Sequence, residues 1–435
     1  MTAEAAPADE GLVRGIGLWS LAANTVNLTI GAGVFVLPAT VAAQMGAAGL
    51  LAYGVCGVAY GLVVLCLAEC GSRVTRSGGP VAYVGVAFGP YAEFLIGMLL
   101  WLAWGLASDA AVAAAFADLA GRAVPFLHSP AGRIAFLVVV LGGLATLNIV
   151  GVRGGARFAT ALTILKIAPL IGLIVIGLPA VQSQHLQHLT DTTAAQLGAT
   201  SLVLFFMFSG AETAVVPAGE IDRPGRTVPL AIVSGLGIIL AIYGGLQFVS
   251  QGVLGDQLAA AKDAPLATVA QRLAGTTGQS ILMAAGALSM FSLIAGDLLA
   301  TPRAMFALAR VGLLPKVFAR VHPRFRTPWI AVATYAGLAL VLALSSAFEQ
   351  LAKAGSVSIL IIYGAVAAAT IQLRRRDVRE HAAAFLIPGG WTVPLLALAV
   401  VLWLLAHTEA PEAIGLTVLS ALISIVYVIR RPASR

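Results

Sequence analysis

Four ionisable residues lie inside long apolar stretches of this sequence, where a charge needs a chemical reason. They are Asp109, Lys166, Glu212 and Asp297. A carboxylate or an ammonium among apolar residues must pair, contact backbone carbonyls or change its protonation state. These residue types therefore indicate polar-ligand binding or proton transfer within an apolar medium. For Asp109, a position near water at the outer end of its stretch is an equal alternative.

The first apolar segment contains a second unusual feature, the sequence TIGAGVFVLP that begins at Thr29. Gly31 and Gly33 lower helix propensity and allow the backbone to approach a ligand closely, while Ala32 keeps the side-chain volume small. Unwound backbone is tolerated at membrane depth only where protein or water satisfies its polar groups. We therefore expect a helix break here. The half-helix from Val34 would offer its N–H groups to an anion such as a carboxylate.

A matching interruption occurs later in the chain, in FSGAETAVVP, which begins at Phe208. Gly210 stands seven residues before Pro217, as Gly31 stands seven residues before Pro38. Paired interrupted apolar segments in corresponding halves of a chain point to the binding site of a secondary transporter. This is the leading functional hypothesis from the residues alone.

The composition places these segments in a membrane. Hydrophobic residues make up 59% of the chain and charged residues 10%, and the mean hydropathy is +0.95, values that exclude an ordinary soluble domain. Apolar runs of about 20 residues are long enough to span a bilayer. The pattern predicts twelve spans, at about 15–43, 47–70, 88–119, 133–150, 158–180, 195–217, 229–252, 279–308, 328–347, 350–373, 388–407 and 412–430.

The basic residues predict the orientation. Most of the 26 Lys and Arg fall in loops and helix ends that lie on one side if the spans alternate from the N-terminus. By the positive-inside rule, both termini are expected in the cytoplasm. The net charge of +7 is then explained by membrane topology, and we expect the lipid bilayer, and no nucleic acid, as a partner.

Charged residues also follow the second span. Glu69, Arg73 and Arg76 precede a Gly-Gly-Pro turn signal, and they are open to two interpretations, a functional gate or ordinary solvation of a loop. Cys66 and Cys70 flank Glu69 on one helix face. Small buried residues are a better interpretation of these cysteines than a metal site.

Four motifs in order give a family resemblance. They are GAGVF in the first span, E-x-G-x-x-x-x-x-S-G-G-P-x-x-Y after the second, G-x-E and GEIDRPGRTVP around the sixth, and PRAMFALARVGLLP after the eighth. Together they resemble the amino acid, polyamine and organocation transporter superfamily. The resemblance implies an all-α polytopic membrane protein with twelve transmembrane helices. Five plus five of them form an inverted repeat with discontinuous helices 1 and 6, and two C-terminal helices follow.

The implied organisation divides the chain into five parts. Residues 1–14 form a cytoplasmic N-terminus, 15–180 the first repeat, 194–373 the second, 388–430 the last two spans, and 431–435 a cytoplasmic C-terminus.

The resemblance also implies roles for residues of a substrate pocket. Trp104 and Ser108 stand where family members line the pocket, Phe206 at the aromatic gate and Ser356 at a polar gate. Asp297 falls where relatives have small polar or aromatic pocket residues, which is a departure from the family pattern.

The intramembrane charges receive roles in the same way. In proton-coupled, sodium-independent members, a lysine at the position of Lys166 lies against the unwound part of the first helix. It then acts either as a proton carrier or as a fixed structural cation. An acid at the position of Glu212 links helices and responds to protonation. Asp297 is left with four alternatives: pairing with a cationic substrate, pairing with Lys166, carrying a proton, or capping a helix.

The resulting hypothesis is a secondary active transporter of α-amino acids in the cell inner membrane. The substrate carboxylate would bind at the first break, and its ammonium at carbonyls freed at Phe208, Ser209 and Gly210. The coupling ion would be a proton, not sodium, and a homodimer is left open.

Two alternatives remain at this stage: an exchanger of a cationic amino acid for an amine product, and a sensor that binds amino acids without transport. An enzyme is not expected, since no metal-ligand cluster or pairing of nucleophile and base stands out. No cofactor and no metal site are expected either.

Overall fold

The computed structural model of this chain describes residues 16–75, 78–150, 156–187, 192–216, 221–262, 264–310, 312–325, 327–345, 348–380 and 384–430. Within these ranges the side chains of residues 156–163, 299–300 and 307 are not described. The described chain is helical throughout and contains no strand. The predicted class, an all-α polytopic membrane protein, is confirmed.

The described part of the first half of the chain forms nine α-helices. They are α1 (Leu18–Thr29), α2 (Gly33–Met45), α3 (Gly49–Arg73), α4 (Pro80–Phe88), α5 (Pro90–Met98), α6 (Leu106–Ala123), α7 (Pro130–Val150), α8 (Ala156–Gly177) and α9 (Gln184–Gln187). A π-helical segment, Leu99–Gly105, joins α5 to α6 into one continuous helix.

The second half begins with another interrupted helix. Its helices are α10 (Ala194–Phe208), α11 (Ala211–Ala214), α12 (Pro224–Leu254), α13 (Pro265–Arg310), α14 (Trp329–Ser345), α15 (Phe348–Arg375), α16 (Thr392–Leu405) and α17 (Ala410–Arg430). Helix α13 is interrupted by non-helical backbone at Ala274 and Gly275.

Among the described residues, eight helical stretches are long and apolar enough to cross a membrane. One of them, Gly33–Arg73, combines α2 and α3, and three further apolar helices are shorter. These stretches establish a multi-pass membrane protein. The number twelve, the inverted repeat and the five sequence divisions remain predictions.

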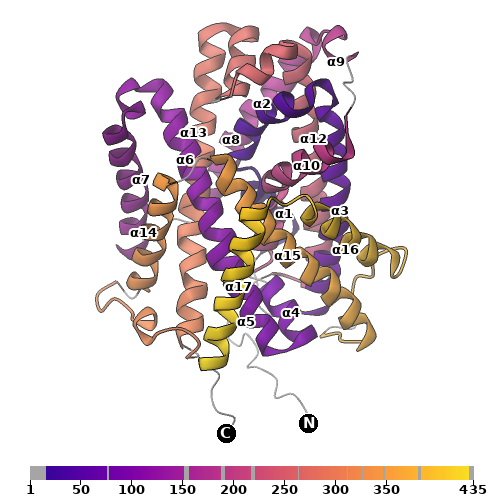
Figure 1. Cartoon of the computed structure of the whole chain (residues 1–435), viewed down its shortest axis with the longest axis vertical. Helices are drawn as coiled ribbons and strands as arrows, with labels where there is room; N and C mark the ends of the chain where they lie inside the picture. Colours follow the sequence, from indigo (N-terminus) through magenta and orange to yellow (C-terminus); the bar gives the residue numbers. More distant parts are fainter. Residues whose placement is uncertain are drawn as a thin grey trace.

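The helices pack in two groups (Figure 1). In the first group, α12 contacts α1 and α3, and α3 also contacts α10. Helices α6, α7, α13 and α14 form a second set, in which each helix contacts the other three. Helix α15 contacts both groups, through α3 and α10 on one side and α6 on the other. A relative movement of the two groups must therefore change the contacts of α15.

Both predicted helix breaks are present. Helix α1 ends at Thr29 and α2 begins at Gly33, so Ile30, Gly31 and Ala32 are unwound. The sequence prediction had the second half-helix begin at Val34, one residue later. A proline inside α2, Pro38, does not end the helix.

The second break lies between Phe208, which ends α10, and Ala211, which begins α11. Gly210 has φ of +145°, a conformation that L side chains rarely adopt. A Cβ atom at Gly210 would lie 2.7 Å from the Leu28 carbonyl oxygen and 2.8 Å from the Thr29 Cα. The two breaks are therefore in direct backbone contact.

This contact predicts the effect of Gly210→Ala. The new methyl group would meet backbone on α1 and would also strain φ, at a cost of about 1–3 kcal/mol for the conformation alone. We expect a lower thermal midpoint of the purified protein and loss of substrate uptake. Gly237→Ala is the matched control, because a Cβ there meets nothing within 4 Å. Equal behaviour of the two variants would contradict the close approach of the breaks.

Candidate functional site

Lys166 lies at the first break, as the family resemblance implied. Its side chain is fully buried. The Nζ atom donates to the carbonyl oxygens of Asn27 at 2.7 Å and Ile30 at 2.9 Å. Because these carbonyls lie at the end of α1, they carry the negative end of that helix dipole. The lysine ammonium is thus stabilised by backbone dipoles.

Two hydroxyl groups contact the remaining carbonyls of this break. Ser289 Oγ lies 3.1 Å from the Ile30 oxygen and 3.3 Å from the Gly31 oxygen. Tyr243 OH lies 3.0 Å from the Thr29 oxygen and 2.8 Å from the Met207 oxygen of α10, and its single proton serves one of them at a time. The Tyr243 hydroxyl therefore connects the two interrupted helices.

No side chain caps the N-terminus of α2. The N–H of Phe35 donates to the Ala32 carbonyl at 2.9 Å, while the first N–H groups of any α-helix lack a partner within the helix. A Cβ at Gly33 would lie 2.4 Å from the Met207 Cβ. Gly33 thus allows α2 to approach α10, so a larger side chain there would first displace α10.

The second break has a carboxylate of its own. Glu212 is fully buried, and its Oε2 accepts the Gly210 N–H at 2.9 Å and the Tyr363 hydroxyl. The Ala211 N–H donates to Tyr60 OH at 3.2 Å. Glu212 therefore links the break to α15, in agreement with its implied role in joining helices.

One detail of the predicted ammonium site is wrong. The Gly210 carbonyl was expected to be free, but it accepts the Thr213 N–H at 3.1 Å. The Ser209 hydroxyl, in turn, donates to the Phe205 carbonyl at 2.9 Å. Of the three proposed carbonyls, those of Phe208 and Ser209 remain as candidates.

Phe206 contacts aromatic rings from two other helices. Its centroid lies 5.7 Å from that of Trp104 and 5.6 Å from that of Phe348, both in edge-to-face geometry. Phe205 instead packs between Tyr60 and Tyr363, each at 5.9 Å. Phe206 thus connects α10 to both α15 and the π-helical segment that holds Trp104, and its role as a gate stays a prediction.

Phe208 makes aromatic contacts only with neighbouring tyrosines in the described region. Its ring lies 6.5 Å from Tyr53, 6.0 Å from Tyr60 and 5.2 Å from Tyr243. Its side chain is therefore packing, and only its backbone carbonyl is a candidate for ligand contact.

Asp109 and Asp297 come together. Asp109 is fully buried, its Oδ2 accepts the Tyr335 hydroxyl at 2.9 Å, and its Oδ1 has no hydrogen-bond partner among the described residues. The Asp297 carboxyl group is close enough to influence that of Asp109. Helix α13 continues past Asp297 to Arg310, so the helix-capping interpretation of Asp297 is wrong. Asp109 lies in the first turn of α6, within the continuous helix from Pro90 to Ala123.

Three smaller predicted residues are buried near these elements. Thr29, at the end of α1, is 3% exposed, Ser108 on α6 is 7% exposed, and Ser356 on α15 is fully buried. The hydroxyl groups of Thr29 and Ser356 have no partner within the described chain. Each could therefore accept a hydrogen bond from a ligand or donate one to it.

Sequence reasoning missed four hydroxyl groups that organise the site: Ser289, Tyr243, Tyr335 and Tyr363. Each lies in an otherwise apolar span, which was the available signal. It is a weak signal, because tyrosine and serine are ordinary residues of membrane helices.

The charges after the second span are not in a solvated loop. Glu69 is fully buried and Arg73 is 2% exposed, so the solvation interpretation is wrong for both; Arg76 lies outside the described residues. Cys70 Sγ lies 3.2 Å from Thr370 Oγ1 of α15, and Cys66 is fully buried one turn earlier. The two cysteines are part of the contact between α3 and α15.

Comparison with known proteins agrees with this architecture. The chain is 29% identical to the "Serine/threonine exchanger SteT" of Bacillus subtilis (strain 168), over 95% of this chain and 96% of that protein. It is 25% identical to the "Branched-chain amino acid permease BcaP" of the same organism, over 92% and 89% respectively. It is also 29% identical to the "Cationic amino acid transporter 9, chloroplastic" of Arabidopsis thaliana, over 92% of this chain and 73% of that protein.

The fold and the interrupted helices define a multi-pass membrane protein of the transporter class. The model of the amino acid permease family matches residues 16–429, and the chain belongs to that family. The superfamily resemblance seen in the motifs is confirmed. Membership implies transport of small amino acid substrates across a membrane, and a transport role rather than an enzymatic one.

The aromatic contacts of α10 predict different effects for two neighbouring phenylalanines. Phe206→Ala removes the contacts with Trp104 and Phe348, so we expect faster loss of bound substrate and at least about tenfold weaker uptake. Phe205→Ala opens a cavity among Tyr60 and Tyr363 and should mainly cost stability, about 3–5 kcal/mol. Uptake and thermal unfolding of both variants separate these effects. Equal losses of uptake at equal stability would mean that both rings are packing.

Proposed function

We propose that this protein is a secondary active transporter of α-amino acids that recognises the carboxylate at the first break and the ammonium at the second. The observation that carries this proposal is the difference between the two breaks. Gly33 follows Gly31 by two positions, as Glu212 follows Gly210. The second break thus has a carboxylate of its own where the first has only a glycine.

The carboxylate site follows from this difference. At the second break, the Glu212 carboxylate accepts the Gly210 N–H. At the start of α2 no side chain caps the helix. A helix N-terminus stabilises an anion through its free N–H groups and its dipole. A substrate carboxylate would accept N–H groups at the start of α2, as the Glu212 carboxylate accepts the Gly210 N–H before α11.

The ammonium site follows from the carbonyls. Those of Thr29, Ile30 and Gly31 already have donors from Tyr243, Lys166 and Ser289. The carbonyls of Phe208 and Ser209 lie at the C-terminal end of α10, where the helix dipole is negative. They would accept the ammonium of the substrate.

We propose a proton as the coupling ion, with no requirement for sodium. The Lys166 ammonium lies at the first break, at the place where a coupling cation would act. It donates to the carbonyls of Asn27 in α1 and of Ile30 directly after α1, so a shift of α1 would remove this stabilisation. The cell inner membrane with both termini in the cytoplasm is the proposed setting, from the distribution of basic residues.

A second candidate function is exchange of a cationic amino acid for an amine. It is favoured by the buried pair Asp109 and Asp297, because two acids with no basic partner among the described contacts could receive a cationic side chain. A sensor without transport is the third possibility. Counterflow of labelled amino acid in proteoliposomes distinguishes it, because a sensor gives no counterflow.

Lys166→Ala tests the coupling. We expect uphill accumulation driven by an inward pH gradient to be lost, while exchange is partly retained. One pH unit supplies about 1.4 kcal/mol, or about tenfold accumulation at one-to-one coupling. Accumulation in proteoliposomes with and without the gradient measures the effect. Lys262→Ala, at an exposed lysine, is the control.

Two outcomes would contradict the proton-carrier role. Accumulation by Lys166→Ala on imposing the gradient would move the role to Asp109, Glu212 or Asp297. Loss of exchange and accumulation together, with partial recovery in Lys166→Arg, would make Lys166 a structural cation that braces the break.

A further inference from the structure

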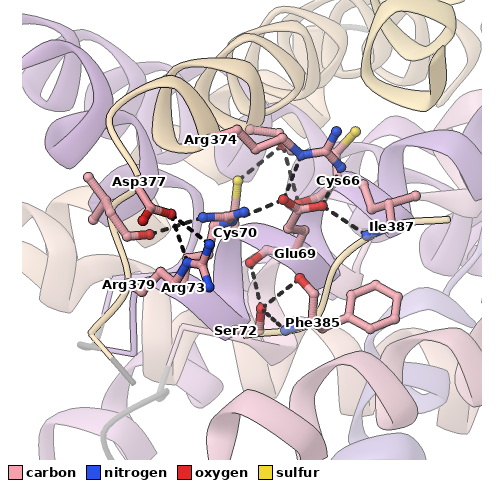
Figure 2. A network of polar contacts seen from close by, with 12 residues as sticks. Cys66, Glu69, Cys70, Ser72, Arg73, Arg374, Asp377, Arg379, Phe385 and Ile387 are labelled. Atoms are coloured by element: carbon pink, nitrogen blue, oxygen red, sulfur yellow. Dashed lines mark hydrogen bonds and ion pairs between the residues drawn. The ribbon is translucent and has the colours of Figure 1, made fainter. Parts of the chain in front are cut away.

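Glu69 lies at the centre of a buried ionic network at the end of α3 (Figure 2). Its Oε1 accepts hydrogen bonds from Arg73 Nε at 2.9 Å and from Arg374 Nε at 2.7 Å. Its Oε2 accepts hydrogen bonds from Arg374 Nη2 at 2.5 Å and from the Ile387 N–H at 3.0 Å. Glu69 itself is fully buried. One carboxylate therefore joins α3, the end of α15 and the segment that leads to α16.

Further hydrogen bonds make the same connection. The Phe385 N–H donates to Ser72 Oγ at 2.9 Å. The Thr75 N–H and hydroxyl donate to Glu380 Oε2 at 2.6 and 2.9 Å, and the Glu380 N–H donates to the Arg73 carbonyl at 3.0 Å. The end of α3 is thus bound to the segment that follows α15.

The network joins parts of the molecule that have different packing partners. Helix α3 packs with α10 and α12, whereas α15 also contacts α6 of the other group. Breaking a buried ion pair by removing one partner is strongly destabilising, because the remaining charge stays uncompensated. The network therefore favours one arrangement of α3 and α15 over all others.

We propose that Glu69 is a positioning residue that closes the side of the protein where α3 ends, and that its network separates whenever the substrate site opens to that side. This inference rests on the proposed transport function. It gives Glu69 a role in one step of transport, the opening of the substrate site to one side of the protein. Glu69 makes no contact with substrate in this proposal. A network that served only folding would stay closed throughout.

The chain contains its own reporters of this opening. Cys70 Sγ lies 3.2 Å from Thr370 Oγ1 and 3.8 Å from the Val366 carbonyl, both on α15. Cys56 is on the same helix but faces α10, with its Sγ 3.1 Å from the Ser201 carbonyl. Both are free thiols and fully buried. Separation of α3 from α15 would expose Cys70 and leave Cys56 covered.

The experiment compares two versions of the full-length protein in proteoliposomes. One retains Cys70 alone (C56A, C66A) and the other retains Cys56 alone (C66A, C70A). The rate of alkylation by N-ethylmaleimide is measured in each, with and without Glu69→Gln. We expect Glu69→Gln to raise the Cys70 rate at least tenfold and to leave the Cys56 rate unchanged.

Two further variants guard against a general loss of structure. Arg374→Lys keeps the charge but loses the two-pronged contact with Glu69, and it should raise the Cys70 rate by a smaller factor. Arg379→Gln removes an exposed ion pair with Asp377 and should change neither rate.

An unchanged Cys70 rate in Glu69→Gln and Arg374→Lys would overturn the proposal, and so would a rise of both cysteine rates together. Counterflow of the same preparations separates this result from the transport function. If counterflow occurs but the Cys70 alkylation rate is unchanged, the proposed role of Glu69 is contradicted and the transport function is not. Absent counterflow in the unmodified protein counts against transport.

Discussion

The requirement that every backbone polar group be satisfied inside the bilayer organises this structure. Each unsatisfied group in an apolar medium costs several kcal/mol, and two helix breaks release many such groups. At the first break, Lys166, Ser289 and Tyr243 donate hydrogen bonds to backbone carbonyls. At the second break, Glu212 and Tyr60 accept hydrogen bonds from backbone N–H groups. In the proposed function, N–H groups at the start of α2 receive the carboxylate of the substrate, and carbonyls at the end of α10 receive its ammonium.

The same constraint explains why distant parts of the chain depend on one another. Gly210 lies against the backbone of Leu28 and Thr29, so the second break packs directly on the end of α1. The Tyr363 hydroxyl connects Glu212 to α15, and Glu69 connects α3 to the far end of that helix. Helix α15 thus contacts both the second break and the Glu69 network.

Much of this could be predicted from the sequence, for a physical reason. Helix breaks need glycine, and an intramembrane charge needs a partner, so Gly31, Gly210 and Lys166 are visible as exceptions in apolar runs. The residues that pair with the breaks and the buried charges cannot be recognised in the sequence in this way. Tyr243 and Ser289 are ordinary residues whose role depends on helix packing, and the burial of Glu69 depends on Arg374, which is distant in the chain. Local spacing also could not show that the Gly210 carbonyl accepts the Thr213 N–H.

Recognition of both α-substituents of an amino acid is the central claim, and ligand-induced thermal stabilisation tests it most directly. The purified protein is first screened against the common amino acids, where a ligand at 100 times its Kd stabilises by about 2.7 kcal/mol. The most stabilising amino acid is then compared with its methyl ester and its N-acetyl derivative. We predict that each blocked form loses the stabilisation. Equal stabilisation by the methyl ester would contradict carboxylate binding at α2, and equal stabilisation by the N-acetyl form would contradict ammonium binding at α10.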